Sequence, residues 1–383
     1  MKAHQDMGQL FDWISVPLSL VGAWPLSKTY FRFTGWIVYY SVYLIGAYAD
    51  LASVFGDLEL MVLNFVETGL QNMIVVRLLV FRFSKILPIL IDAAKKDMRD
   101  ENWENDEERQ IYFHYYSSAM TFFKTFVGCS CCTTVMYSSR PIQEYFVYGL
   151  PNGTNMIMPA YHMRVFVDLD NVRNVVLVHI FQMPLMAGAI FHVTSICLLV
   201  ALVFNVCGQL SVLSYRIVTL NPSESDDANS VFRKFVTQHL RVIWMAKSIE
   251  NVFQMLLLNE LVGTTVVLGL IAYSSLTTLD NAEGAALATF GSYTLSMIIL
   301  VYANCLVGEH LNIESERLRD AFYQCNWLEL PKSYRKALLI CIRAQVPLQL
   351  TAGGFYPFTH ESFTDIIKKS GAYVSMLRTM TMQ

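Results

Sequence analysis

The residues that could do chemistry in this chain gather near its C-terminal end, in a segment too polar for a lipid-facing helix. Between Phe358 and Met380 the chain carries His360, Glu361, Asp365, Lys368, Lys369 and Arg378. A lipid-facing helix needs about 20 mostly apolar residues, and a charge at membrane depth costs a few kcal/mol unless it faces protein or water. We therefore predict that this helix is shielded from lipid and lines an aqueous path.

Two rows of side chains on this helix suit a pore lining. They recur at four-residue spacing, as Gly371, Ser375 and Thr379 in one row and Ala372, Met376 and Met380 in the other. A single helix cannot enclose a channel, but symmetric copies around an axis could, and rings of apolar side chains close such channels by dewetting. Packing within a monomeric bundle suits the same residues, so both interpretations stay open at this point.

Other residue clusters give weaker signals. Cys129, Cys131 and Cys132 have no His or carboxylate nearby, and His179 and His192 lie more than about three helical turns apart, so we predict no metal site. Glu67 and Arg77 fall in apolar segments. A charge at membrane depth is a functional candidate, and a pair that ties helices together would explain these two residues equally well. The sequence has no nucleophile–base spacing and no phosphate loop, so neither an enzyme nor a cofactor is indicated.

The elements that must position the last helix are apolar runs of membrane length. Of 383 residues 54% are apolar and 15% charged, against about a quarter charged in soluble domains, which indicates a membrane protein that crosses the bilayer repeatedly. The net charge of −3 gives no basic field for nucleic acid. The sequence predicts an all-α membrane protein with seven transmembrane helices, formed by the last helix together with runs at about 35–55, 61–81, 119–138, 179–207, 253–275 and 285–308.

Lys and Arg in the connections predict the orientation, because they concentrate on the cytoplasmic side. The outer connections hold only Arg140, Arg164 and Arg173, which places the N-terminus in the cytoplasm and the C-terminus outside. This orientation is opposite to that of a G-protein-coupled receptor. The long outer connection at 139–178 contains an acceptor sequence for N-glycosylation at Asn152.

The inner connections at 95–109 and 226–250 read as helices, and a helix continues past the sixth span to about residue 326. They could be solvated helix ends, or a cytoplasmic helical platform that anchors subunits to one another, which we favour. Pro347, Gly353, Gly354 and Pro357 must break the seventh element into a cytoplasmic piece near 332–344 and a pore-lining piece from about Thr359. Residues 1–308 would form the six-span bundle and 309–383 the anchor and pore helices.

Both ends of the chain resemble insect odorant receptors. The residues that carry the resemblance are Gly22–Ala23–Trp24–Pro25 before the first span, then Ala321–Phe322–Tyr323, Trp327, Arg343–Ala344–Gln345–Val346–Pro347, Leu350–Thr351–Ala352–Gly353–Gly354, Phe363, Tyr373 and Leu377–Arg378. The resemblance implies a ligand-gated, non-selective cation channel in the plasma membrane of a sensory dendrite. It also implies a tetramer of this subunit with a common co-receptor, in which the seventh helices line the pore with Tyr373, Met376, Thr379 and Met380.

The resemblance also implies an odorant pocket in the outer half of the bundle. By position its residues would be Leu70, Met73, Ile74, Cys132, Met136, His179, Met183, Met186, Tyr273, Phe290, Tyr293 and Thr294. Met and aromatic side chains adapt to small flexible ligands, and the lack of charge favours a neutral volatile. Core packing between helices is the alternative role for each of these residues.

The alternatives are a gustatory-type channel and, with less support, a G-protein-coupled receptor. The gustatory signature would fall on Ala372–Tyr373 to Thr379–Met380, where only Tyr373 matches. The family's co-receptor has a longer connection between spans four and five than this chain, so an odorant-tuned subunit fits best. A G-protein-coupled receptor is disfavoured by the orientation, and a transporter by the lack of internal repeats.

Overall fold

The computed structural model describes residues 8–27, 29–56, 58–98, 103–148, 172–219, 228–278, 284–324 and 347–381. These residues form long helices and one short two-stranded sheet. The elements are α1 (Gln9–Leu20), α2 (Tyr30–Ser53), α3 (Leu58–Phe83), α4 (Leu87–Asp97), α5 (Asp106–Tyr148), α6 (Val172–Val218), α7 (Ala228–Thr278), α8 (Gly284–Gln324), β1 (Thr351–Ala352), β2 (Tyr356–Pro357) and α10 (His360–Thr381).

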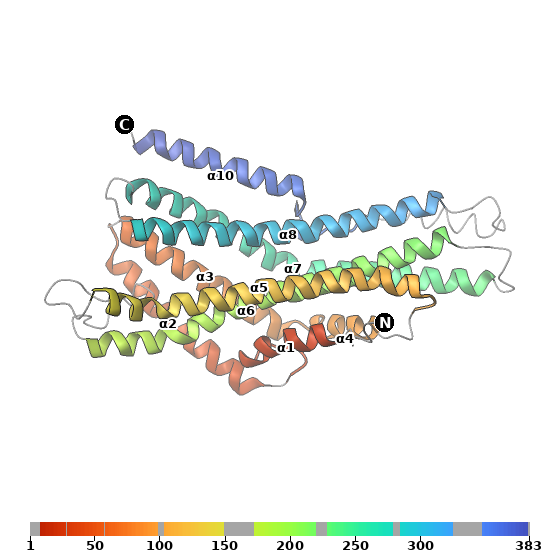
Figure 1. Cartoon of the computed structure of the whole chain (residues 1–383), viewed down its shortest axis with the longest axis horizontal. Helices are drawn as coiled ribbons and strands as arrows, with labels where there is room; N and C mark the ends of the chain where they lie inside the picture. Colours follow the sequence, from red (N-terminus) through yellow and green to blue (C-terminus); the bar gives the residue numbers. More distant parts are fainter. Residues whose placement is uncertain are drawn as a thin grey trace.

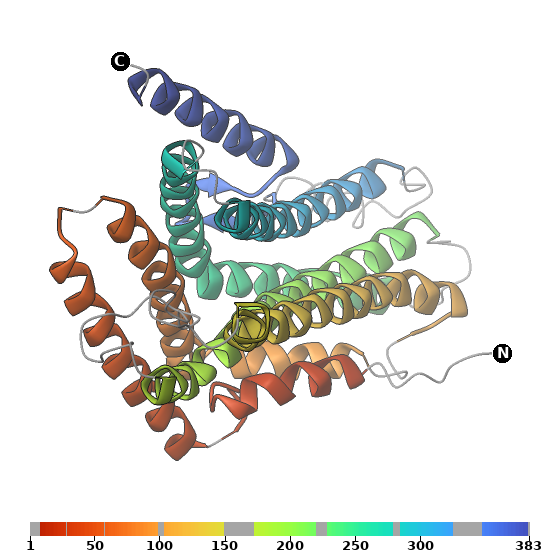
Figure 2. The same ribbon diagram turned by 60° about the vertical axis from the view of Figure 1, so that its left-hand side comes forward.

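The long helices lie along one axis of an elongated bundle. Figure 1 shows α5, α6 and α8 running along the length of the molecule, with α10 beside α8 at the edge. The apolar centre of α6 is almost wholly buried, and α6 contacts α1, α3, α4, α5, α7 and α8. Figure 2 shows the same bundle turned, with α2 and α3 on one flank and α10 on another. The core of the chain therefore forms around α6.

Five of the six predicted apolar runs lie within a helix of the structure, and the run at 35–55 extends two residues past the end of α2. Among the described residues, four segments are long and apolar enough to cross a membrane by length and composition, at Asp106–Met136, Val176–Val218, Arg233–Ala272 and Thr294–Gln324. The last helix, α10, is not among these four, as its polar composition predicts. The prediction of a nearly all-helical, membrane-type chain is confirmed, apart from the small sheet.

Helix limits differ from the sequence prediction in three places. Residues 95–109 do not form one helix, because α4 ends at Asp97 and α5 begins at Asp106. The outer connection predicted at 139–178 is shorter, since α5 continues to Tyr148 and α6 begins at Val172. Helix α1 was not predicted, because Pro17 lies within it.

Local sequence explains two helix starts. Helix α4 has a proline in its first turn, where the missing amide hydrogen costs nothing, and the backbone N–H of Leu87 donates to Ser84 Oγ at 3.2 Å. Helix α5 opens with Asp106, Glu107 and Glu108, whose negative charge favours the positive end of the helix dipole. The residues at these two helix starts therefore favour beginning a new helix at each place.

The break before the last helix is a hairpin. Strands β1 and β2 pair antiparallel, and the turn between them places Gly353 at φ 62° and Gly354 at φ 80°, a region that glycine adopts without strain. The predicted break and the start of the outer piece near Thr359 are confirmed. The predicted cytoplasmic piece at 332–344 lies outside the described residues.

Candidate functional site

The buried members of the predicted pocket face different neighbours in the bundle. Met73 and Ile74 of α3 are buried, and Met186 of α6 is buried as well. A Cβ added to Gly263 of α7 would lie 1.8 Å from Met73 Cε, so Met73 packs directly on the α7 backbone. The sulfur of Met186 accepts a hydrogen bond from Ser138 Oγ at 3.1 Å. Met73 therefore lies between α3 and α7, and Met186 between α5 and α6.

Other predicted pocket residues are less enclosed. Cys132, Met136 and Met183 are exposed on the isolated chain, and Met136 is 70% exposed. Burial therefore does not support the expectation that these three line an enclosed pocket, because their positions on α5 and α6 point away from the core. Leu70, His179 and Thr294 are partly buried, whereas the side chains of Tyr273, Phe290 and Tyr293 lie outside the described set.

A buried ion pair lies at the centre of the bundle. Arg77 of α3 pairs with Glu260 of α7, and their side chains are 5% and 4% exposed. Arg77 Nη1 also donates to Ser195 Oγ of α6 at 2.7 Å, and Asn304 Nδ2 of α8 donates to Glu260 Oε1 at 3.1 Å. Of the two roles left open for Glu67 and Arg77, Arg77 does tie helices together, but not as a pair with Glu67. Its partner is Glu260 and not Glu67, which lies on the same helix as Arg77.

Two more buried side chains with polar atoms lie on α2 and α3. Tyr40 Oη and both amide atoms of Gln71 have no hydrogen-bond partner among the described residues. Tyr40 Oη lies 1.8 Å from where a Cβ on Gly188 would be, so the hydroxyl rests on the α6 backbone. Buried polar atoms are usually paired with protein or water, so these positions are suited to water or to a polar group of a ligand.

Helix α8 carries the contacts that hold the start of α10. The rings of Tyr302 and His360 stack with centroids 6.2 Å apart, and Tyr302 meets Phe363 edge to face at 5.3 Å. Glu309 accepts a hydrogen bond from the backbone N–H of His360 at 3.1 Å. Asn304, which donates to Glu260, lies on the same helix, between Tyr302 and Glu309. A displacement of α8 at Asn304 would therefore also move the residues that contact the start of α10.

Helix α7 holds the hairpin that precedes α10. The backbone N–H of Gly353 donates to the Gln254 carbonyl at 2.9 Å, and Thr351 Oγ1 donates to Glu250 Oε1 at 2.7 Å. The start of α10 is thus fixed to both α7 and α8, the two helices that also carry Glu260 and Asn304.

The predicted pore rows lie on α10 as the spacing requires. Ser375 Oγ donates to the Gly371 carbonyl at 3.1 Å, and Gly371, Ala372, Ser375 and Met376 are exposed on the isolated chain. Met376 is 56% exposed. The side chains of Tyr373, Thr379 and Met380 lie outside the described set, as does Asn152 with its whole segment.

Sequence reasoning missed Tyr40, Gln71, Glu260 and Asn304. A signal for Glu260 and Asn304 was available, because each interrupts an otherwise apolar run and a buried charge or amide needs a partner. No comparable signal distinguished Gln71 from a polar residue at a helix surface. Among the described residues no cluster of His, Cys, Asp and Glu could hold a metal ion.

A family model and several characterised proteins match this chain along most of its length. A family model described as 7tm Odorant receptor matches residues 69–371. Odorant receptor 13a of Drosophila melanogaster is 22% identical over 396 residues, which cover 95% of this chain and 94% of that protein. Odorant receptor 10a is 24% identical and covers 79% and 77%. Odorant receptor 2a is 25% identical over 55% of this chain and 56% of its own length, so that match spans about half of each protein.

Solved structures show the same fold. The chain matches the insect olfactory receptor OR5 from Machilis hrabei in complex with eugenol, with a TM-score of 0.79 and 14% identity over 98% of this chain and all of that one. A second structure of the same receptor gives a TM-score of 0.78 at 12% identity, over 97% and 99% of the two chains. The family match covers most of the sequence, and the helices described above superpose on a receptor of the same kind. The chain belongs to the insect odorant receptor family, which is a family of receptors and not of enzymes.

Proposed function

We propose that the chain is the odorant-tuned subunit of a ligand-gated, non-selective cation channel that assembles with the family's co-receptor, as a tetramer in the plasma membrane. The observation that carries the proposal is the match over 98% of the chain to a receptor solved with eugenol, a small neutral molecule. The charge-poor outer half of the bundle supports a neutral volatile as the ligand.

The pore assignment is supported by α10. Figure 2 shows this helix at the edge of the bundle. Its residues Gly371, Ala372, Ser375 and Met376 are exposed and do not pack into the core of the chain. Exposed apolar side chains on an isolated subunit are typical of surfaces that another copy or a pore will cover. We propose that Tyr373, Met376, Thr379 and Met380 line the conduction path.

The orientation and the division of the chain are proposals as well. The distribution of Lys and Arg supports a cytoplasmic N-terminus, an extracellular C-terminus and seven spans. Figure 1 shows the ends of α5, α7 and α10 at the same side as the starts of α6 and α8, which is consistent with helices that alternate in direction. On this orientation 1–308 is the six-span bundle, 309–383 holds the anchor and pore helices, and Asn152 is available for glycosylation. Sensory dendrites are the location that the family implies.

Within the proposed pocket the buried residues are the stronger candidates for ligand contact. Met73, Ile74 and Met186 are buried, and Leu70 packs partly buried against the core. Arg77 follows Leu70, Met73 and Ile74 along α3. A ligand that moves Met73 would press on Gly263 of α7. Gly263 is three residues after Glu260, so the two lie on the same face of that helix. Contact at Met73 therefore has a physical route to α7 and from there to the hairpin.

The test is co-expression with the co-receptor and recording of currents against a panel of volatiles. We expect a volatile to evoke a cation current that requires both subunits and persists when G-protein signalling is blocked. Met73→Ala should raise the half-maximal concentration by about tenfold, while Met183→Ala on the exposed face should leave it unchanged. A slow current abolished by G-protein inhibitors would exclude the channel.

A further inference from the structure

A cavity opens at the end of the bundle where α5 begins, α6 ends and α7 begins. Its walls include Asp97, Trp103, Arg216, Gln238 and Arg241. On the orientation proposed above, this end faces the cytoplasm. The cavity gives water a path to the last turn of α4, where Asp97 is almost fully buried.

The carboxylate of Asp97 fastens α4 to three other helices. Asp97 Oδ1 lies 2.6 Å from Arg241 Nη2 of α7, and Asp97 Oδ2 accepts a hydrogen bond from Asn205 Nδ2 of α6 at 3.4 Å. Asn205 Oδ1 in turn accepts one from the hydroxyl of Tyr112 on α5. Arg241 Nη2 also donates to the Ala93 carbonyl of α4 at 3.3 Å. The charge on a single carboxylate therefore supports contacts among α4, α5, α6 and α7.

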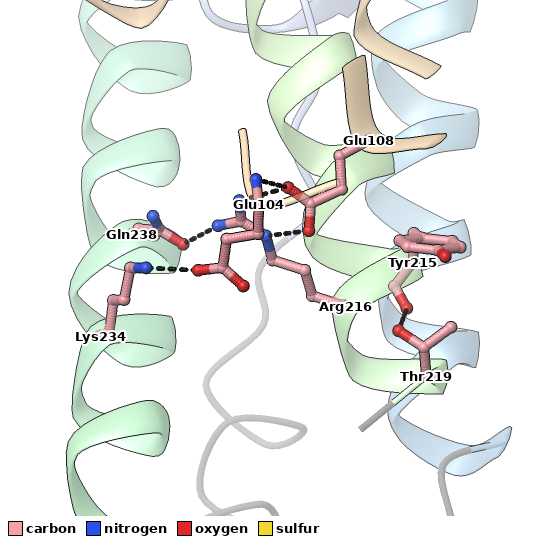
Figure 3. A network of polar contacts seen from close by, with 7 residues as sticks. All are labelled: Glu104, Glu108, Tyr215, Arg216, Thr219, Lys234 and Gln238. Atoms are coloured by element: carbon pink, nitrogen blue, oxygen red, sulfur yellow. Dashed lines mark hydrogen bonds and ion pairs between the residues drawn. The ribbon is translucent and has the colours of Figure 1, made fainter. Parts of the chain in front are cut away.

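The neighbouring charges on α5, α6 and α7 have partners of their own. Figure 3 shows Arg216 Nε and Nη2 donating to the two oxygens of Glu108 at 2.8 and 2.6 Å, and Lys234 paired with Glu104. Arg216 Nη1 also donates to Gln238 Oε1 at 2.8 Å. The ion pair described for Asp97 is the one with Arg241.

The two lysines in the last turn of α4 also form ion pairs with other carboxylates. Lys95 pairs with Asp12 of α1 at 2.9 Å, and Lys96 pairs with Asp92 on its own helix at 3.0 Å. Neither ammonium group is directed at Asp97 in these contacts. Among the described contacts, Arg241 and Asn205 stabilise the charged form of Asp97, and burial disfavours it.

We propose that Asp97 takes up a proton when the cytoplasm acidifies, and that this loosens the ion pair between α4 and α7. The proton from water in the cavity binds a carboxylate oxygen, and the neutral acid no longer holds the Arg241 guanidinium by charge. Arg241 has a side chain that is 47% exposed and can turn to water. Burial raises the pKa of Asp97 to about 6, while Arg241 and Asn205 oppose the rise.

Helix α7 connects this fastening to the hairpin before α10. Arg241 and Glu250 are about 14 Å apart along the helix, and Glu250 and Gln254 hold Thr351 and Gly353. A release of α7 from α4 therefore reaches the element that fixes the start of α10. The regulatory part of this inference rests on the proposed channel function, whereas the protonation of Asp97 does not.

The protonation is tested on the purified full-length chain by infrared difference spectroscopy between about pH 7.5 and about pH 5. We expect a carboxylic-acid band with a midpoint near pH 6 that disappears in Asp97→Asn. The matched control is Asp92→Asn on the same helix, whose exposed carboxylate should leave that band in place. Arg241→Gln should move the midpoint upward, because the guanidinium favours the charged carboxylate. A band that survives in Asp97→Asn would overturn the assignment.

The regulatory part is tested in excised patches of the channel formed with the co-receptor, with the cytoplasmic pH varied. Acidification should shift the half-maximal volatile concentration by about fivefold, the lower end of typical coupling between two sites, and Asp97→Asn should abolish the shift. An unchanged current, or a shift that persists in Asp97→Asn, would overturn regulation even if the infrared titration succeeds. If no volatile opens the wild-type channel, the proposed function fails, and the infrared result still decides whether Asp97 binds the proton.

Discussion

Removing one partner of the Arg77–Glu260 pair should destabilise the fold far more than removing both. The two side chains are 5% and 4% exposed, so either charge left alone has almost no access to water. Breaking such a buried pair on one side costs about 3–5 kcal/mol, whereas replacing both partners by apolar residues of similar volume is often nearly neutral. We therefore expect Arg77→Met and Glu260→Met each to be severe, and the double variant to recover most of the loss.

The double variant should not recover fully. Ser195 loses the donor at 2.7 Å, and Asn304 loses the acceptor at 3.1 Å, so two neutral hydrogen bonds disappear at about 1 kcal/mol each. The two single losses would sum to at least about 6 kcal/mol, whereas the double variant should lose about 2 kcal/mol. The coupling energy between the two substitutions should thus be about 4 kcal/mol or more, with a sign that makes the double variant milder than additivity predicts.

The assay is thermal unfolding of detergent-purified receptor at one fixed scan rate, because membrane proteins often unfold irreversibly. Each single variant should lower Tm by about 5–10 °C relative to wild type, and the double variant by less than half of that. The control is the exposed pair Lys96 and Asp92, where single and double variants should stay within about 1 °C because surface pairs contribute little. If the Arg77 and Glu260 variants proved additive, the ion pair would not be the source of the stability.

Further predictions follow from packing, titration and pore position. Gly308→Ala would place a Cβ 2.2 Å from the Phe358 carbonyl oxygen, so it should displace the hairpin from α8, abolish the current and lower Tm. Gly371→Ala meets open space and should fold normally. Equal melting of the two variants would contradict this reasoning. Burial raises the pKa of Asp97 from 3.8 to about 6, so the folded chain binds this proton more tightly than the unfolded chain. The free energy of unfolding should therefore increase as pH falls from about 7 to about 4, by at most about 3 kcal/mol from this group. Asp97→Asn should remove this increase, which melting experiments at several pH values would measure. Met380→Lys should change conductance or cation selectivity at normal surface expression, and unaltered currents would count against the pore assignment.

The sequence alone determined the features that depend on composition and short-range pattern. Apolar runs of membrane length predicted α2, α3, α5, α6, α7 and α8, and the glycines and prolines between 347 and 357 predicted the break before α10. The polar composition of α10 distinguished it from the other spans. These inferences succeeded because helix formation and membrane partition depend on residues close together in the chain.

Only the tertiary structure decided which residues meet. Arg77 and Glu260 are 183 residues apart, and Tyr112 and Asn205 are 93 apart, so no local periodicity could pair them. The same reason explains the pocket, where Met73 and Met186 proved buried and Met136 and Met183 exposed although all four had equal claims from the sequence. A helical pattern gives the direction of a side chain around its own axis, but packing between helices decides what fills that direction.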